Sequence, residues 1–313
     1  MPNNQTKALV QGSMMVAIFT ILMTMAAYVP LISILALLFA PLPIAWYSAN
    51  YNRKSSILVG IAGALLTFFT SGIIMLPFAL VFGLLGLVMG EAIRLKKSKV
   101  YIFISSGIAM LFSFAIIHLC TLFVTNVNII QMSLQFAREN YEQSLEITKP
   151  LSNQMTITPE QLDMMFKTME LTVPATVTIT AFLLAFLVIA VNMPLLGRLG
   201  LDVPKFAPFQ DMRLPRAVLW YYMIVLSINL FIRPELGSTL QVIVLNVSYM
   251  LWLLLIVQGI SLIHYFIASK GLPNPVKWVA TLLAIPLSSF IILIGIIDLG
   301  FDVRSFIAGK TKK

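Results

Sequence analysis

The chain has 313 residues, of which 59% are hydrophobic and only 11% are charged, and its mean hydropathy is +0.94. A soluble globular protein carries roughly 25% charged residues, so this composition excludes an ordinary soluble domain. The net charge of +9 does not indicate a nucleic-acid-binding protein, because the basic residues lie mainly in short loops between apolar runs, as the positive-inside rule expects. Unbroken apolar runs such as 181–191 argue against a β-barrel, whose strands alternate apolar and polar residues.

The predicted fold class is all-α: a polytopic transmembrane helical bundle of about nine spans (8–10), each near the 20 residues that a bilayer requires. The first five apolar runs are 8–28, 31–48, 56–70, 73–93 and 101–124. Basic clusters at 53–54 and 94–99 separate some of these runs. Pro41 and Pro43 bend or shorten the second run, so the freed backbone groups must find partners within the bundle.

The character of the chain changes over residues 126–170, which hold six of its twelve acidic residues. Apolar residues recur there at helical spacing, and Thr158-Pro159-Glu160-Gln161 is a good helix start, with a Thr cap, Pro at the first position and Gln three residues after the cap. We expect an extramembrane amphipathic helical hairpin between the fifth and sixth spans. It is either an interfacial element packed against the membrane domain or a lid over a cavity.

Four more apolar runs follow at 171–195, 217–232, 240–268 and 276–297. With Lys7 in the cytoplasm, the basic clusters at 53–54, 94–99 and 198–216 fall inside and the acidic hairpin falls outside. Nine crossings would place the basic C-terminal tail outside, against the positive-inside rule. Either the last run is two half-spans broken at Pro286, or another proline-rich run is re-entrant.

The sequence contains no Walker A loop, no HExxH and no GxSxG pattern. We therefore expect no enzyme activity, no cofactor and no metal ion. Polar residues at membrane depth are costly and often functional. The candidate ligand-binding residues are His118, late in the fifth span, and Asn126 and Asn128 just beyond it. The alternative is that all three are interfacial residues whose hydrogen bonds go to water or backbone.

Three further polar residues lie in the last apolar runs. Gln258 and His264 are six residues apart in one predicted helix, which puts them on different faces, so each is expected to hydrogen-bond to a neighbouring helix. Asp298 ends the last run. We expect a buried pairing of Asp298 with Arg304 or with a partner from another helix.

Small residues form two predicted helix faces. Gly83, Gly86 and Gly90 lie in the fourth span and include a GxxxG spacing, and Ala8 and Gly12 form a similar face in the first span. Small residues let helix backbones approach closely in lipid. We expect both faces to pack within the bundle, with docking of a membrane-protein partner as the alternative.

Five stretches carry a resemblance to a known family. They are VPLISILALLFAPLPIAWYSANYNRKSSILVGIAGALLTFFTSG at 29–72, LPFALVFGLLGLVMGEAIRLKK at 76–97, RLPRAVLW at 213–220, QGISLIHYFIASKGLP at 258–273 and IIDLGFDVR at 296–304. The chain resembles the YybS-like family of predicted bacterial membrane proteins over nearly its whole length.

The first six spans are also similar to the S components of energy-coupling-factor vitamin transporters. Those proteins are six-helix bundles with both ends inside, and small residues on their first helix dock the coupling subunit. Ala8 and Gly12 are the nearest matches here to those docking residues. The additional spans after residue 200 depart from that family.

These features together predict a multi-pass protein of the bacterial cell membrane with a cytoplasmic N-terminus. Residues 1–200 would form a six-span core like an S component, including the outer hairpin 126–170, and residues 201–313 would add C-terminal spans and a basic tail. The leading hypothesis is a small-molecule-binding or transport-associated subunit without its own ATPase, which relies on a coupling partner. A membrane scaffold or regulatory protein that binds other proteins is the alternative, and an intramembrane enzyme acting on lipid is a third reading. The expected surroundings are the lipid bilayer, and no nucleic acid is expected as a partner.

Overall fold

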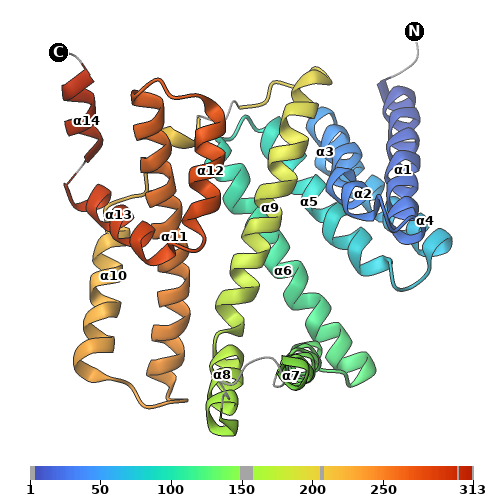
Figure 1. Cartoon of the computed structure of the whole chain (residues 1–313). Helices are drawn as coiled ribbons and strands as arrows, with labels where there is room; N and C mark the ends of the chain where they lie inside the picture. The colour runs from blue at the N-terminus through green and yellow to red at the C-terminus, as the bar shows by residue number, and fades with distance from the viewer. Residues whose placement is uncertain (1–3, 149–157, 205–207, 302, 312–313) are drawn as a thin grey trace. The chain divides into compact units, whose positions relative to one another are not determined.

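The computed structural model describes residues 4–148, 158–204, 208–301 and 303–311 (Figure 1). Within these ranges the chain forms helices joined by turns, and none of the described residues lies in a β-strand. Long apolar runs fold this way because the hydrocarbon core offers no water, so backbone N–H and C=O groups must bind one another. The predicted all-α membrane bundle is therefore confirmed.

Seven helical segments of the described chain are long and apolar enough to cross a bilayer. They are α1 (Asn4–Tyr28), α2 (Ser33–Phe39) together with α3 (Pro41–Asn50), α4 (Arg53–Ser71), α5 (Leu76–Arg94), α6 (Lys99–Thr125), α9 (Val173–Arg198) and α11 (Thr239–Ser269). A pair of shorter helices, α12 (Asn274–Ala284) and α13 (Ser288–Phe301), meets the same criterion together but is bent by 113°. The expected count of nine spans is not confirmed, whereas the predicted break at Pro286 is present between these two helices.

The remaining helices are shorter or amphipathic. They are α7 (Ile129–Thr148), α8 (Pro159–Leu171), the 3₁₀ turn η2 (Phe209–Asp211), α10 (Ala217–Ser227), the π-helical turn η3 (Ile228–Ile232) that continues α10, and α14 (Val303–Thr311). The predicted hairpin between the fifth and sixth spans corresponds to α7 and α8, and its residues 149–157 lie outside the described ranges.

Residue contacts divide the chain into two compact units. Unit 1 comprises Met1–Phe136 and Val177–Lys205, and unit 2 comprises Ala137–Thr176 and Phe206–Lys313. Most of the 126–170 segment therefore groups with the C-terminal helices. The expected division into a six-span core and additional spans near residue 200 stays a prediction.

In unit 1, glycines bring the backbones of α5 and α3 into direct contact. A Cβ atom on Gly90 would lie 2.3 Å from the carbonyl oxygen of Ala45, and one on Gly86 would lie 2.7 Å from that of Pro41. No larger residue fits at either position without moving a backbone. Gly83 is also buried, but its Cβ would meet nothing nearer than Phe19, at 3.9 Å.

The small residues of α1 also face the interior of unit 1. A Cβ on the buried Gly12 would lie 3.1 Å from a methyl carbon of Val59 on α4, and the Tyr47 hydroxyl donates a hydrogen bond to the Ala8 carbonyl (3.2 Å). In this structure both small-residue faces are therefore occupied by helices of the same unit. Docking of a partner through them would require these contacts to open.

The second span of unit 1 is broken between α2 and α3. Pro41 lacks an N–H group, so the helix cannot continue its hydrogen bonds through this point. The Asn192 side chain of α9, which is fully buried, donates to the carbonyl oxygens of Leu38 (2.7 Å) and of Val188 in its own helix (2.8 Å). A carbonyl beside the break thus receives its hydrogen bond from a side chain of another span, as the sequence analysis expects of freed backbone groups.

In unit 2, α11 is the central helix, and α10, α12, α13 and α14 all contact it. The closest approach is between α11 and α13, where a Cβ on Gly259 would lie 2.2 Å from the Ile291 carbonyl oxygen and one on Gly295 would lie 2.3 Å from that of Leu255. This contact has the same physical basis as that between α5 and α3 in unit 1, because small residues allow dispersion contacts between backbones.

The part of the α7–α8 hairpin that belongs to unit 2 is held by side-chain pairs. The predicted capping box is present: the Thr158 side chain accepts from the Gln161 backbone, and the Gln161 side chain accepts from the Thr158 backbone. The rings of Tyr141 and Phe166 meet edge to face with centroids 6.3 Å apart, and Arg138 donates to Asp163 (2.6 Å). The interpretation of the hairpin as a lid over the first spans stays a prediction.

Candidate functional site

A hydrogen-bonded junction holds the end of α8 against α11. The Asn246 side chain of α11 accepts from the backbone N–H of Ala175 (2.7 Å) and donates to the carbonyl oxygen of Leu171 (2.7 Å). Helix ends leave N–H and C=O groups without intrahelical partners, and here one amide of another helix serves both kinds of group. The junction fixes which face of α8 looks toward α11.

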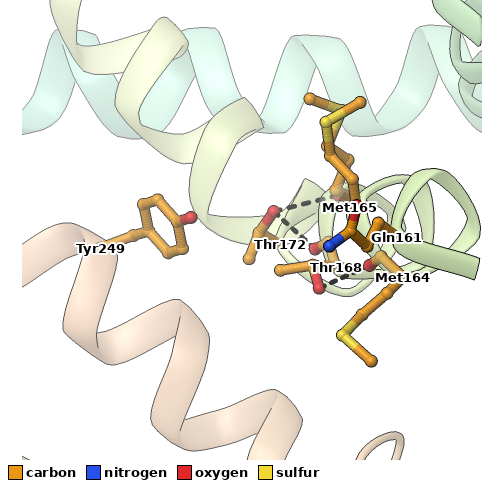
Figure 2. A pocket seen from close by; sticks show the side chains of 7 residues that line it. Gln161, Met164, Met165, Thr168, Thr172 and Tyr249 are labelled. Atoms are coloured by element: carbon orange, nitrogen blue, oxygen red, sulfur yellow. Dashed lines mark hydrogen bonds between the residues drawn. The ribbon is translucent and has the colours of Figure 1, made fainter. Parts of the chain in front are cut away.

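An open groove of about 380 Å³ lies between that face of α8 and one aromatic residue of α11 (Figure 2). The seven lining residues are Gln161, Met164, Met165, Thr168, Met169, Thr172 and Tyr249. The first six lie at positions i, i+3, i+4, i+7, i+8 and i+11, so they share a single face of the helical segment. Figure 2 shows the Tyr249 ring on α11 with its hydroxyl directed toward Thr172.

The polar groups of the groove differ in their free hydrogen-bonding capacity. The hydroxyls of Thr168 and Thr172 donate to carbonyl oxygens of the preceding turn, at 2.8 Å for Thr168 to Met164 and 3.0 Å for Thr172 to Thr168. Their oxygen lone pairs can still accept. The Gln161 amide nitrogen and the Tyr249 hydroxyl have no protein partner within the described part of the chain. The groove therefore offers two exposed donors without a protein partner in the described ranges, beside two hydroxyl acceptors.

The apolar part of the groove consists mainly of methionine side chains, which are unbranched and adapt to irregular shapes. The described lining includes no Asp, Glu, Lys, Arg or His. A molecule that fits this site has an apolar body and an uncharged polar end that can both accept and donate hydrogen bonds. The same residues offer no general base or carboxylate for hydrolytic chemistry.

The sequence-predicted ligand-binding residues lie elsewhere and have local roles. Asn126 ends α6 in the left-handed conformation (φ 55°), and Asn128 accepts hydrogen bonds from the backbone N–H groups of Ile130 and Gln131 at the start of α7. His118 is half-buried on α6, and its buried Nδ1 atom has no hydrogen-bond partner among the described residues. None of these three residues lines the groove, and their role in binding a ligand stays a prediction.

The other polar candidates form a buried network in unit 2. Asp298 accepts from the Gln258 amide (2.6 Å) and from Arg304 Nε (3.1 Å), and the side chains of this ion pair are almost completely buried. The pairing expected between Asp298 and Arg304 is therefore present. Gln258 also accepts from the backbone N–H of Leu214 (2.9 Å), which joins α11 to the chain entering α10.

His264 contacts a different helix from Gln258, in agreement with their predicted placement on different faces of α11. Its Nε2 atom lies 2.7 Å from the Thr281 hydroxyl and 3.1 Å from the Lys277 carbonyl oxygen, both on α12. The two residues therefore do not share a ligand position. Each connects α11 to a neighbouring segment.

The sequence patterns revealed neither the groove residues, Tyr249 among them, nor Asn246. Asn246 had a detectable signal, because an amide inside a long apolar run needs a hydrogen-bond partner in lipid. The methionines Met164, Met165 and Met169 gave only the periodicity of an amphipathic helix, which does not distinguish a packed face from an open one.

The helices and their apolar length define the class: this is a multi-pass α-helical integral membrane protein. The sequence profile of the family described as "Predicted membrane protein (DUF2232)" matches residues 17–299, and the chain belongs to that family. A protein of Bacillus subtilis (strain 168) named "Uncharacterized protein YybS" is 26% identical over 311 residues, which cover 96% of this chain and 98% of that protein. No solved structure matches the chain significantly. The predicted resemblance to the YybS-like family is confirmed, and the likeness to S components stays a prediction.

Proposed function

We propose that this protein is a non-enzymatic membrane subunit that binds an uncharged amphipathic small molecule in the α8–α11 groove. The observation that carries the proposal is the lining itself: methionines beside the free Gln161 amide and Tyr249 hydroxyl. Its volume of about 380 Å³ lies within the range of ligand sites, which are mostly apolar clefts with a few placed polar groups. Such a binding role fits a transport-associated protein, and the chain's lack of a Walker A loop leaves the energy to a coupling partner.

The distribution of charge supports a location in the bacterial cell membrane with the N-terminus in the cytoplasm. Five spans precede α7, so a cytoplasmic N-terminus puts α7 and α8 outside and the basic segment 198–216 inside. The groove then faces the outer side.

The test is native mass spectrometry of the full chain purified in detergent, which detects a co-purifying molecule by its added mass. Gln161→Glu keeps a capping-box residue at this position but places a carboxylate in the groove. Tyr249→Phe removes the free hydroxyl and keeps the ring. We expect the bound fraction to fall by about tenfold or more in Gln161→Glu, which corresponds to about 1.4 kcal/mol, and to fall less in Tyr249→Phe.

The matched control is Gln143→Glu, the same chemical change on the exposed surface of α7. It should leave the bound fraction unchanged. A wild-type protein that carries no small molecule, or one whose adduct is equally strong in all three variants, would contradict the proposal. Loss of a co-purifying protein instead of a small molecule in Gln161→Glu would favour the scaffold or regulatory alternative.

A further inference from the structure

The last apolar run, α12 and α13, is too short in each part to cross a bilayer. With 11 and 14 residues, the two helices are about 16 Å and 21 Å long, whereas the hydrocarbon core is about 30 Å thick. The 113° bend between them prevents their lengths from adding up along one direction. The run must therefore be a strongly bent span or a hairpin that leaves the membrane on the side where it entered.

Both ends of the run are attached to the same short turn, η2. Near its start, Lys277 donates to the side-chain oxygen of Gln210 (2.8 Å). After its end, Arg304 donates to the carbonyl oxygens of Gln210 (2.6 Å) and Met212 (2.9 Å). Two ends that reach one residue cannot lie on opposite sides of a bilayer.

The distance that α12 and α13 extend along α11 agrees with this attachment. A close backbone contact of α13, that of Gly295 with Leu255, lies 14 residues before the end of α11 at Ser269 and so about 21 Å from it. Figure 1 shows α12 and α13 beside the C-terminal half of α11. Thus α12 and α13 occupy only part of the depth that α11 spans.

The same turn shows that α10 does cross. Ser261 lies within 2.8 Å of the carbonyl oxygens of Phe209 and Met212, and it is 22 residues after the start of α11 at Thr239. The segment that precedes α10 therefore lies about 33 Å along α11 from the point where α11 begins. The chain crosses between these two levels through α10 and η3, whose 16 residues cover about 24 Å, and the flanking segments cover the rest.

We infer that α12 and α13 form a re-entrant hairpin closed by Lys277 and Arg304 on the η2 turn, and that the chain crosses the bilayer eight times. The basic tail then lies on the same side as segment 198–216, as the positive-inside rule requires. Burial of Arg304 is tolerated because four hydrogen bonds from its guanidinium reach Asp298, Gln210, Met212 and Ser261.

The experiment is cysteine accessibility in a Cys120→Ser background, with the full chain in cells. Single cysteines are introduced at Leu272 after α11, at Gly309 in α14, at Glu235 between η3 and α11, and at Ser289 beside the hairpin bend. All four positions are exposed or, for Gly309, have no atom within 4 Å of an added Cβ. An impermeant maleimide is applied to intact cells and, separately, after permeabilisation.

We expect Leu272→Cys and Gly309→Cys to label from one side and Glu235→Cys from the other, with Ser289→Cys shielded from both. This result supports the hairpin whichever side proves to be the cytoplasm, so it is independent of the proposed function. Labelling of Gly309→Cys and Leu272→Cys from opposite sides would overturn the inference, as would labelling of Ser289→Cys from the side of Glu235→Cys.

Discussion

Both units of the chain bring helix backbones together through glycine, but they differ in one buried polar contact. In unit 1, the closest contact between spans is made by Gly86 and Gly90 of α5 against the backbone of α3, and the buried side chain that bridges two spans, Asn192, is neutral. Unit 2 has glycine contacts of the same kind, at Gly259 and Gly295, and in addition a buried ion pair, Asp298 with Arg304. The hydrophobic effect does not drive helices together in lipid, so their association depends on close packing and hydrogen bonds.

The buried ion pair of unit 2 corresponds to a structural requirement that the spans of unit 1 do not have. The helices of unit 1 that meet through glycine belong to spans, whose ends are kept apart by the membrane itself. In unit 2, the α12–α13 pair enters and leaves on one side according to our inference, so nothing but its contacts keeps it at depth. An arginine with several acceptors suits that task, because it fixes position and direction together.

The largest expected effect comes from breaking the buried ion pair. Arg304→Met leaves the Asp298 carboxylate buried without its cation, and such changes typically cost about 3–5 kcal/mol of stability. The double variant Arg304→Met/Asp298→Leu removes both charges and should recover much of that loss. Unfolding of the purified protein in mixed micelles measures both. Equal destabilisation of the single and double variants would show that the carbonyl acceptors, and not the charge of Asp298, govern this contact.

The corresponding test in unit 1 uses one methyl group. Gly90→Ala places a Cβ 2.3 Å from the Ala45 carbonyl oxygen, so the backbones must separate, and overpacking of this kind costs about 1–3 kcal/mol. Gly83→Ala is the matched control in the same helix, because its Cβ would meet only Phe19 at 3.9 Å. The midpoint temperature of thermal unfolding in detergent should be lower for Gly90→Ala than for the wild type. For Gly83→Ala it should be unchanged or higher. Similar values for both variants would mean that α5 does not rest on α3 as described.

Smaller effects are expected from replacing the neutral amides that join helices in each unit, Asn246 in unit 2 and Asn192 in unit 1. Asn246→Ala leaves the Leu171 carbonyl without its side-chain donor and the Ala175 N–H without its acceptor. Polar groups left without a partner in this way reduce stability by about 1–3 kcal/mol. Asn192→Ala removes one hydrogen bond to another segment, that to Leu38, and should cost less. The same unfolding assay ranks them. If Asn192→Ala proves the more damaging, then the broken span of unit 1 depends on its amide more than the α8 junction does.

The smallest effect concerns the exposed hairpin, where charges are solvated. A hydrogen bond from its own backbone N–H, and next one from the Thr158 side chain, hold the pKa of Glu160 below its ordinary value of 4.5. A lowered folded-state pKa means that this contribution to the stability of the α8 N-terminus is present above the unfolded-state pKa and is lost as pH falls through the folded-state pKa. Limited proteolysis of the hairpin should thus accelerate as pH drops from about 6 to about 3. Glu160→Gln should reduce this acceleration, and an unaltered pH profile in that variant would assign it to other groups.

The sequence predicted those features that depend on local patterns. The break at Pro286 follows from the missing N–H of proline, and the capping box at Thr158 and Gln161 follows from residue types at fixed spacing. The pairing of Asp298 with Arg304 was also predictable, because a carboxylate at the end of an apolar run needs a nearby cation.

Other features depend on contacts between distant segments and left no local pattern. Hydropathy measures the apolar length of a run but not its direction, so a re-entrant pair such as α12 and α13 reads like one more crossing. The groove exists because Asn246 holds the end of α8 against α11 and thereby places Tyr249 opposite the methionines. Nothing in the sequence of α8 specifies which helix lies opposite it.

The attachment of Arg304 also sets an order of events during synthesis. The carbonyl acceptors at Gln210 and Met212 precede it by 94 and 92 residues, so α10, α11 and both hairpin helices have been made before the guanidinium emerges. The contact that closes the C-terminal region can therefore form only after all of these helices have been made. A polypeptide that terminates before Arg304 retains the Asp298 carboxylate in an apolar setting without its cation. The Asp298 carboxylate therefore gains its cation only after translation has passed the end of the hairpin.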